Sequence, residues 1–381
     1  MSFRGMKLPF AASFVVQAAV MAQAPSGGAT PRPIRQRASL ESLAQPPVPG
    51  DPLELVPGDA QPVSDAEQRA AAVHLIVKAR DLSNVRAHPY DLKTTFVSYG
   101  VSSGAPEGTW TLEDTSPAHE VYRWSAQGPS FSTVNLRSSQ LVSSNQTSGA
   151  IPLRLAQARA AIFYMDAPPG PYAALRTAAG SLNGAAVTCV LMTRMAQAKP
   201  VPGPRRWEES EHCVDPKSGL LMTYSPVPGM YVAYDYTNAL HFRDKLIPGK
   251  FTITQAGQTA IEARTESVTD PGKVDPALFQ PEGLEKIGAG PLMGPPWKVR
   301  TGAVFPAGSP NSAVQMVILD GMLAPDGKFG EVHVLASSNP ALNQAALDEA
   351  AKWNHWQSPD DAQPGAAPQS HEVFFTVEFA P

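Results

Sequence analysis

Cysteine and histidine are the side chains in this sequence that could do chemistry most readily, and their spacing limits what that chemistry is. His212 stands next to Cys213, as two metal ligands could. A zinc site needs three or four ligands at compatible spacing, and no further histidine or cysteine lies near this pair in the sequence. The other histidines are scattered along the chain. The sequence therefore predicts no metal site.

The motifs of common enzymes are also missing from the sequence. It contains no HExxH, no G-x-S-x-G and no P-loop motif. The glycines of residues 288–294 have no strand before them and no helix after them, the context that a phosphate-binding loop requires. Asp360 and Asp361 are adjacent and are interpreted as a solvated loop rather than a catalytic pair. We expect a protein that is not an enzyme and binds no cofactor.

Cys189 and Cys213 are the only cysteines in the chain. An isolated pair in an exported protein is a disulfide candidate, and closing a loop of this length would stabilise the fold by roughly 3 kcal/mol. Two buried free thiols are the alternative. A disulfide is expected if the protein is exported.

Export is indicated by residues 1–22, which have the order of a secretory signal peptide. Arg4 and Lys7 precede a short apolar run, and small residues end it at Ala22, where cleavage is expected. The alternative is an uncleaved anchor, but a proline and a glutamine interrupt the run, and it falls short of the roughly 20 residues that a spanning helix needs. No later segment is apolar enough to cross a bilayer, so no transmembrane span would remain after cleavage.

Composition divides the chain into two candidate domains. The 381 residues are 43% hydrophobic and 17% charged, and a net charge of −4 gives no basic footprint for nucleic acid. Many of the 39 prolines and 29 glycines cluster in residues 23–63 and 285–312. Stretches of this kind are typical of extended linkers. They leave a large segment, residues 64–284, and a small one, residues 313–381.

The large segment has the pattern of an antiparallel sheet with helices. Ser64 and Glu67 form a capping box for a helix that runs to about Arg80, and residues 151–164 show the spacing of a second helix. Apolar and charged residues alternate in strands such as residues 261–266. Such alternation is typical of sheets with one solvated face. We predict one curved antiparallel sheet that holds a helix.

This order of elements resembles the open half-barrel of the lipoprotein-carrier proteins of the LolA/LolB-like group. A leading helix is followed by long antiparallel strands with a helix between them. The close of the segment, Arg264 to Val268 and then Asp275 to Pro281, also looks like the close of such domains. The resemblance implies a concave face that binds an acyl chain or another apolar ligand. A packed sheet with no cavity is the alternative.

The small segment has the order β-β-α-β. Residues 314–319 and 332–335 form strands on either side of an Asp-Gly step, which is a strong hairpin signal. Asn339 caps a helix whose first residue is Pro340. Residues 373–379 alternate as a closing strand. The pattern predicts a helix on one face of a small antiparallel sheet.

The small segment resembles the C-terminal domain of TonB. The features that carry this resemblance are Asp326-Gly327, a second strand that ends at Ser338, Ala345-Ala346, Lys352-Trp353, Gly365 and the apolar last strand. The residues after Trp353 depart from the family's usual aromatic-proline step, and Trp353 itself is interpreted as core packing rather than a ligand contact. The resemblance implies that a sheet edge pairs with a strand of an envelope protein. From Val314 on, nine acidic residues stand against two lysines and no arginine, which favours a basic partner.

Together these features predict an α+β protein with a large curved antiparallel sheet, or half-barrel, with covering helices, and a small C-terminal β-β-α-β domain. The predicted function is that of a non-catalytic periplasmic protein of the cell envelope. Its C-terminal module would bind a protein, and its large domain would take a lipid or another apolar ligand. The alternative is a TonB-type energy transducer, anchored by an uncleaved N-terminal helix, that supports transport through outer-membrane receptors.

Overall fold

The computed structural model describes residues 59–100, 103–119, 121–138, 141–146, 151–163, 169–170, 173–193, 202–280, 284–286, 297–307, 314–324, 328–352 and 371–380. All of them belong to one unit, Leu40–Pro381. The predicted signal peptide, most of the first linker, the Asp326-Gly327 turn, Trp353, Asp360, Asp361 and Gly365 lie outside the described residues. No helix within these described ranges is long and apolar enough to cross a membrane.

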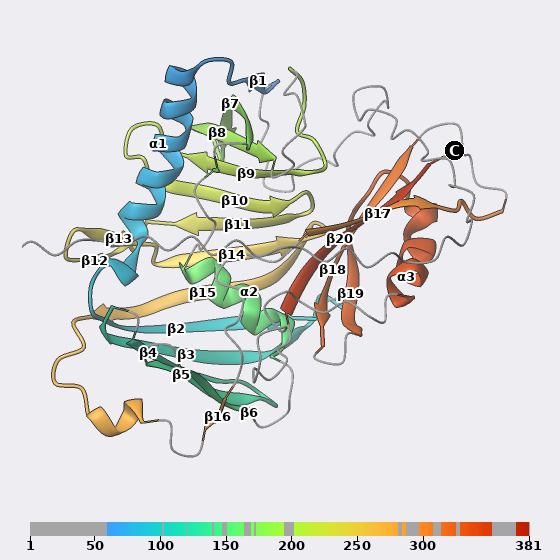
Figure 1. Ribbon diagram of the computed structural model, residues 1–381. Helices are drawn as coiled ribbons and strands as arrows, with labels where there is room; N and C mark the ends of the chain where they lie inside the picture. Colours follow the sequence, from blue (N-terminus) through green and yellow to red (C-terminus); the bar gives the residue numbers. More distant parts are fainter. Residues whose placement is uncertain are drawn as a thin grey trace, which may run out of the picture. The chain divides into compact units, whose positions relative to one another are not determined.

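The largest element is a sheet of 14 strands in the spatial order β1-β7-β8-β9-β10-β11-β14-β15-β2-β3-β4-β5-β6-β16 (Figure 1). In chain order its strands are β1 (Gln61–Pro62), β2 (Tyr90–Tyr99), β3 (Pro106–Ala118), β4 (Val121–Gln127), β5 (Ser132–Ser138), β6 (Leu141–Gln146), β7 (Ala174–Leu182), β8 (Ala185–Thr193), β9 (Glu209–Val214), β10 (Leu221–Val227), β11 (Met230–Asp235), β14 (Lys250–Gln255), β15 (Gln258–Thr269) and β16 (Glu285–Lys286). A separate hairpin, β12 (Leu240–Phe242) with β13 (Lys245–Ile247), lies between β11 and β14 in the chain.

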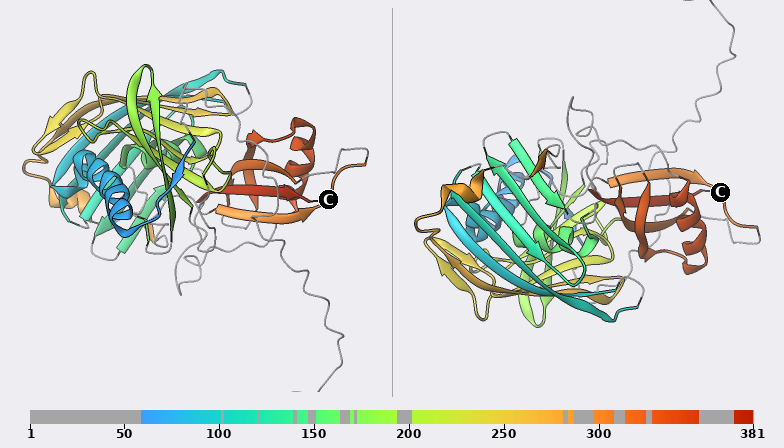
Figure 2. Two further views of the ribbon diagram at one scale, coloured as in Figure 1. Left: turned by 90° about the horizontal axis from the view of Figure 1, so that it is seen from above. Right: turned by 90° about the horizontal axis from the view of Figure 1, so that it is seen from below.

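Two meanders make up this large sheet. One runs from β2 to β6 and the other from β7 to β15, and they join where β15 pairs with β2, with Ile261 opposite Ser98. Each outer edge carries a two-residue strand, β1 on β7 and β16 on β6. Both of these short strands come from stretches that the sequence analysis predicted as linkers. The sheet is antiparallel and curved, as predicted (Figure 2).

Two helices lie on the inner face of the curved sheet, α1 (Ala66–Ser83) and α2 (Leu153–Phe163). The predicted capping box of α1 is wrong by one residue. Asp65 is the cap, and its carboxylate accepts the Gln68 N–H at 2.8 Å, while the Ser64 N–H donates to the Gln68 side chain. A carboxylate at a helix N-terminus gains from the helix dipole as well as from the hydrogen bond, which favours Asp65 over the neighbouring hydroxyl. The short helices η1 (Val85–Ala87) and η2 (Pro276–Phe279) flank the strands.

The second sheet has four strands in the order β17-β20-β18-β19. Its strands are β17 (Trp297–Ala303), β18 (Gln315–Leu323), β19 (Phe329–Ser337) and β20 (His371–Phe379). Its helices are η3 (Pro340–Leu342) and α3 (Asn343–Ala351), and Asn339 caps η3 through the Ala341 N–H. The predicted order β-β-α-β is present in β18, β19, α3 and β20. The sequence missed β17, which runs parallel to β20 and comes from the stretch predicted as the second linker.

Both faces of the second sheet are buried, and they belong to different cores. Val317, Leu319 and Phe375 pack with α3. Met316 and Ile318 point the other way and share one buried cluster with side chains of the large sheet and α2. In a strand, successive side chains point to opposite faces, so β18 supplies both cores alternately.

Candidate functional site

The inner face of the large sheet is apolar and rich in aromatic rings. Phe96 on β2 stacks on Trp110 on β3, with ring centroids 5.6 Å apart, and the Trp110 indole donates to the Ser98 hydroxyl. This face is covered by α2 and by the second sheet, whose buried residues complete the same cluster. The members that come from the helices and from the segments of the second sheet are Ala79, Leu155, Ala158, Ala161, Val314, Met316, Ile318, Leu335, Ala336 and Phe374.

A set of buried polar side chains interrupts this apolar contact, and we call it the junction cluster. It consists of Arg154 and Gln157 on α2, Gln255 at the end of β14, Asp320 on β18 and Glu372 on β20. The register of the second sheet sets Asp320 opposite Phe374, and Glu372 lies two residues before Phe374 on the same face. Strand geometry therefore turns both carboxyl groups toward α2 and the large sheet.

Two glutamine amides connect the charges of the junction cluster. The Gln157 amide donates to Asp320 at 2.9 Å and to Glu372 at 2.8 Å, and the Gln255 amide donates to Asp320 at 2.7 Å. Their carbonyl oxygens accept from the Arg154 guanidinium. Each glutamine thus faces the cation with its oxygen and the carboxyl groups with its nitrogen, which satisfies both ends of a side chain that water does not reach.

Burial dominates the electrostatics of the junction cluster. It raises the pKa of Asp320 to about 7, although the hydrogen bond from Gln255 and the charge of Arg154 oppose this shift. Burial also raises the pKa of Glu372 well above its usual range, and the neighbouring Asp320 charge adds to the shift. Near neutral pH the pair therefore holds at least one proton and carries no more than about one negative charge, which Arg154 balances.

His333 on β19 lies at the edge of the same cluster. Its Nε2 is 3.7 Å from an Asp320 oxygen, too far for a hydrogen bond. Burial, with the nearby Arg154 charge, lowers the pKa of His333 to about 4. The imidazole is therefore neutral near pH 7, and Arg154 is the one cation that faces the two carboxyl groups within the described part of the chain.

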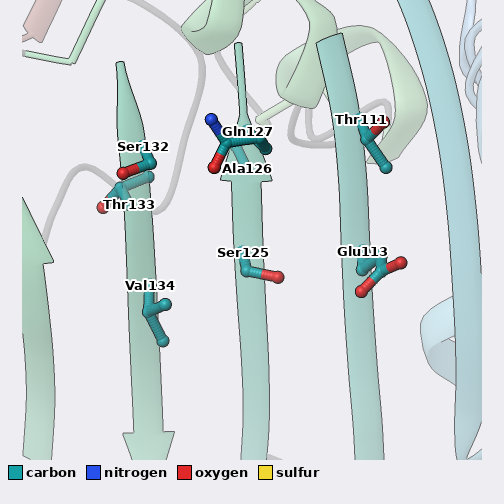
Figure 3. A pocket seen from close by; sticks show the side chains of 8 residues that line it. All are labelled: Thr111, Glu113, Ser125, Ala126, Gln127, Ser132, Thr133 and Val134. Atoms are coloured by element: carbon teal, nitrogen blue, oxygen red, sulfur yellow. The ribbon is translucent and has the colours of Figure 1, made fainter.

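The cavities on the described residues have mixed polar and apolar linings. One of about 400 Å³ is lined by Tyr99, Ser103, Gly104, Gln258, Thr259 and Glu262. One of about 280 Å³ lies beside the junction cluster, between Arg154, the β14–β15 turn and residues 332–334 of β19. One of about 310 Å³ lies on the outer face of β3, β4 and β5, lined by Thr111, Glu113, Ser125, Ala126, Gln127, Ser132, Thr133 and Val134 (Figure 3). Ligand pockets are mostly apolar, whereas polar side chains make up much of the lining of all three cavities, so none resembles a lipid pocket. The described side chains of the inner face are packed against α2 and the second sheet. This arrangement corresponds to the packed sheet that the sequence analysis gave as the alternative to an open concave face.

The two cysteines predicted to pair are joined in a disulfide. Cys189 on β8 and Cys213 on β9 lie directly opposite each other, and both are fully buried. A Glu211 oxygen lies 3.7 Å from the Cys213 sulfur, and the Arg205 guanidinium is 3.0 Å from the Glu211 carboxylate. His212, next in the chain, is buried and packs against the Tyr224 ring. The paired sulfur atoms are not free to ligate a metal.

The comparisons with known proteins give distant structural similarity only. No protein-family model and no curated protein matches the chain. A putative outer membrane lipoprotein-sorting protein domain from Vibrio parahaemolyticus aligns with 8% identity over 55% of this chain and 96% of its own, with a TM-score of 0.36. A LolA superfamily protein from Nitrosomonas europaea aligns with 11% identity over 55% and 97%, with a TM-score of 0.37.

A DUF1329 family protein from Desulfovibrio piger aligns with 8% identity over 57% of this chain and 98% of its own, with a TM-score of 0.39. The first two structures carry names from the group that residues 64–284 resemble. With TM-scores below 0.5, these alignments do not assign a family to this chain. These three alignments give no evidence for a TonB C-terminal domain.

Proposed function

We propose that this protein is a non-catalytic component of the bacterial cell envelope, exported to the periplasm, whose large sheet binds an acyl chain or another apolar ligand on its inner face. One observation carries the proposal. Part of the apolar inner face is covered by Met316, Ile318 and Phe374, which belong to a sheet that is not part of the large sheet's hydrogen-bonded ladder. The second sheet can therefore leave the inner face without breaking that ladder, and a ligand can replace it.

The free energy lost when these side chains leave the inner face is similar in size to the free energy that a bound acyl chain would gain there. Burying three such side chains contributes roughly 5–9 kcal/mol, at about 1.5–3 kcal/mol each. An acyl chain gains about 0.8 kcal/mol for each buried methylene group, so roughly six to eleven methylenes match the burial of these three side chains. The ring faces of Phe96 and Trp110 on β2 and β3 would then line the bound chain.

Titration of the full chain with cis-parinaric acid, a fluorescent fatty acid, tests this proposal. We expect saturable binding by the wild-type protein. A Phe374→Ala variant should bind at least tenfold more tightly, because the substitution removes a competitor for the inner face. Val134→Ala, which alters the outer face, is the matched control and should bind like wild type. No saturable binding by either wild type or Phe374→Ala would rule out the ligand proposal.

We further propose that the second sheet engages a protein partner by adding its strand to the edge at β17. The other edge, β19, is approached by the β10–β11 turn, where a Cβ on Gly229 would lie 2.3 Å from the Leu335 carbonyl oxygen. Among the described strands, β17 pairs with β20 alone. Strand addition supplies affinity through main-chain hydrogen bonds, so an open edge is the feature it needs.

Adjacent prolines in β17 test strand addition. The N–H groups of Lys298 and Val299 point to opposite sides of the strand, so one proline removes a bond to β20 and the other removes a donor from the open edge. We expect one variant to lose thermal stability and the other to lose the partners captured from periplasmic extract while keeping its melting temperature. Capture that survives both substitutions would exclude this edge.

The mature N-terminus separates the two versions of the proposal. Purified protein that begins at Gln23 supports cleavage and a free periplasmic protein. Retention of residues 1–22 would instead support the transducer alternative, anchored by its N-terminus. Edman sequencing or mass spectrometry of the protein from its native membrane fraction decides between them.

A further inference from the structure

We propose that Asp320 and Glu372 form a proton-dependent latch that holds the second sheet on the large sheet and releases it as the pH rises. This proposal rests on the proposed function only in that release of the second sheet would expose the apolar inner face, where the ligand is proposed to bind. The latch itself depends on the contacts between the two sheets, and it operates with or without a ligand.

The geometry of the junction cluster accommodates one negative charge rather than two. Two carboxyl groups from β18 and β20 meet a single guanidinium, that of Arg154, and two neutral amides. Both carboxyl groups are buried. The second Asp320 oxygen, Oδ1, has no hydrogen-bond partner in the described part of the chain. A second carboxylate charge would therefore be buried without a cation of its own, which is strongly unfavourable.

The other charged groups around the cluster do not supply the missing cation. Exposed Glu331 on β19 accepts the Leu153 N–H, and exposed Glu107 on β3 acts on Arg154. Both are acidic, so they disfavour a second negative charge further. The titratable and charged groups that face the cluster, element by element, are Arg154 on α2, Glu107 on β3, Asp320 on β18, Glu331 and His333 on β19, and Glu372 on β20.

Counting protons gives the direction of the latch. When the second sheet separates, each buried group returns to its ordinary pKa. Between about pH 4.5 and 6.5, seating the sheet takes up protons on Asp320 and Glu372 and releases one from His333, whose pKa is lowered to about 4 when buried. Above the Asp320 pKa of about 7, Glu372 alone takes up a proton. Seating therefore takes up about one proton across this range, and the opening constant should rise about tenfold per pH unit.

Hydrogen exchange on the full chain measures this opening. We expect the protection factors of β18, β19 and β20 amides, each taken relative to the intrinsic exchange rate at the same pH, to fall as the pH rises from 6 to 9, by up to about tenfold per unit. Amides of β8 and β9 provide an internal control that should not follow. Glu372→Gln keeps a donor toward Asp320 but does not titrate, so the fall above pH 7.5 should disappear. Asp348→Asn, on the exposed side of α3, should keep the wild-type slope.

Two results would overturn the latch. One is wild-type protection of the second sheet that does not change between pH 6 and 9, a result that needs no variant to fold. The other is a Glu372→Gln variant that keeps the full slope. Failure of the latch is distinguishable from failure of the proposed function. A pH slope without cis-parinarate binding would leave the latch standing, and binding without a slope would leave the ligand proposal standing.

Discussion

Two groups of buried charges in this protein have opposite arrangements. Arg176 on β7 meets Glu209 on β9 through two contacts of 2.8 and 2.5 Å, and Arg205, just before β9, meets Glu211 on β9 at 3.0 Å. Each cation there has its own carboxylate. In the junction cluster, two carboxyl groups share one cation and a proton replaces the second. Both groups are hidden from water, so the difference lies in charge matching rather than in burial.

Charge matching decides what each group can do. A matched pair brings no net charge into the interior. An unmatched carboxyl group must bind a proton to stay buried, so the contact that it makes depends on pH. We infer that the matched end of the large sheet serves as the fixed part of the molecule and the junction cluster as its adjustable part.

The largest effect is expected at the matched end. Glu209→Gln leaves the Arg176 guanidinium buried without its carboxylate, and breaking a buried pair in this way costs about 3–5 kcal/mol. Urea unfolding at pH 7 would measure the loss. A loss below about 1 kcal/mol would mean that the matched pair adds little to the stability of the fold. It would contradict the inference that this end is the fixed part of the molecule.

The disulfide at the same end should contribute slightly less. It closes a loop with a sequence separation of 24, so replacing Cys189 and Cys213 together by alanine should cost about 3 kcal/mol. Thermal unfolding of the double variant, beside reduced and oxidised wild type, would measure it. Reduced wild type should unfold like the double variant, and equal melting temperatures for all three forms would contradict the prediction.

A smaller effect is expected at the junction cluster, and it depends on pH. The pKa of His333 is lowered to about 4 when the protein is folded, against about 6.5 unfolded. The folded state therefore binds fewer protons, and stability is lost as the pH falls from 6.5 toward 4. Replacing His333 by asparagine removes this loss, which at pH 5 is about 2 kcal/mol. The variant-minus-wild-type difference should be larger at pH 5 than at pH 8, and a difference equal at both would contradict it.

The smallest effect is expected for an exposed pair. Lys93 and Glu113 are 3.2 Å apart on the outer face, with side chains about half exposed. Exposed pairs contribute less than about 1 kcal/mol because water and salt screen them. Lys93→Ala should therefore change the free energy of unfolding by less than about 1 kcal/mol. A larger loss would show that a charge pair can stabilise this fold through proximity alone, without burial.

The local elements of the fold could be predicted from the sequence, because local physics determines them. The antiparallel meanders follow from alternation, and α2 follows from its apolar stripe. The Asn339 cap and the strands on either side of α3 follow from turn and capping chemistry. The pairing of β15 with β2, the two-residue strands at the sheet edges and the addition of β17 could not be predicted, because those contacts join residues far apart in the chain.

The junction cluster was also missed, although a signal for it exists. Asp320 interrupts the apolar run of residues 316–323, and Glu372 stands immediately before another apolar run. An acidic residue inside a buried strand needs a partner, so each position pointed to a buried interaction. Arg154 gave no such sign, because an arginine beside the apolar stripe of a helix is usually exposed. Only the packing of the second sheet on α2 brings the three together.

The join between β2 and β15 has a consequence for how the chain folds. The Tyr99 hydroxyl on β2 donates to Glu262 on β15 across 163 residues, so the two meanders unite late. Each meander can form by itself as its hairpins close, but until β15 arrives the edge of β2 has no partner. Long-range strand pairing is slow, and open strand edges invite aggregation. We expect a slow last phase in refolding, visible in Trp110 and Trp124 fluorescence, and a chain that needs protection while its two halves remain apart.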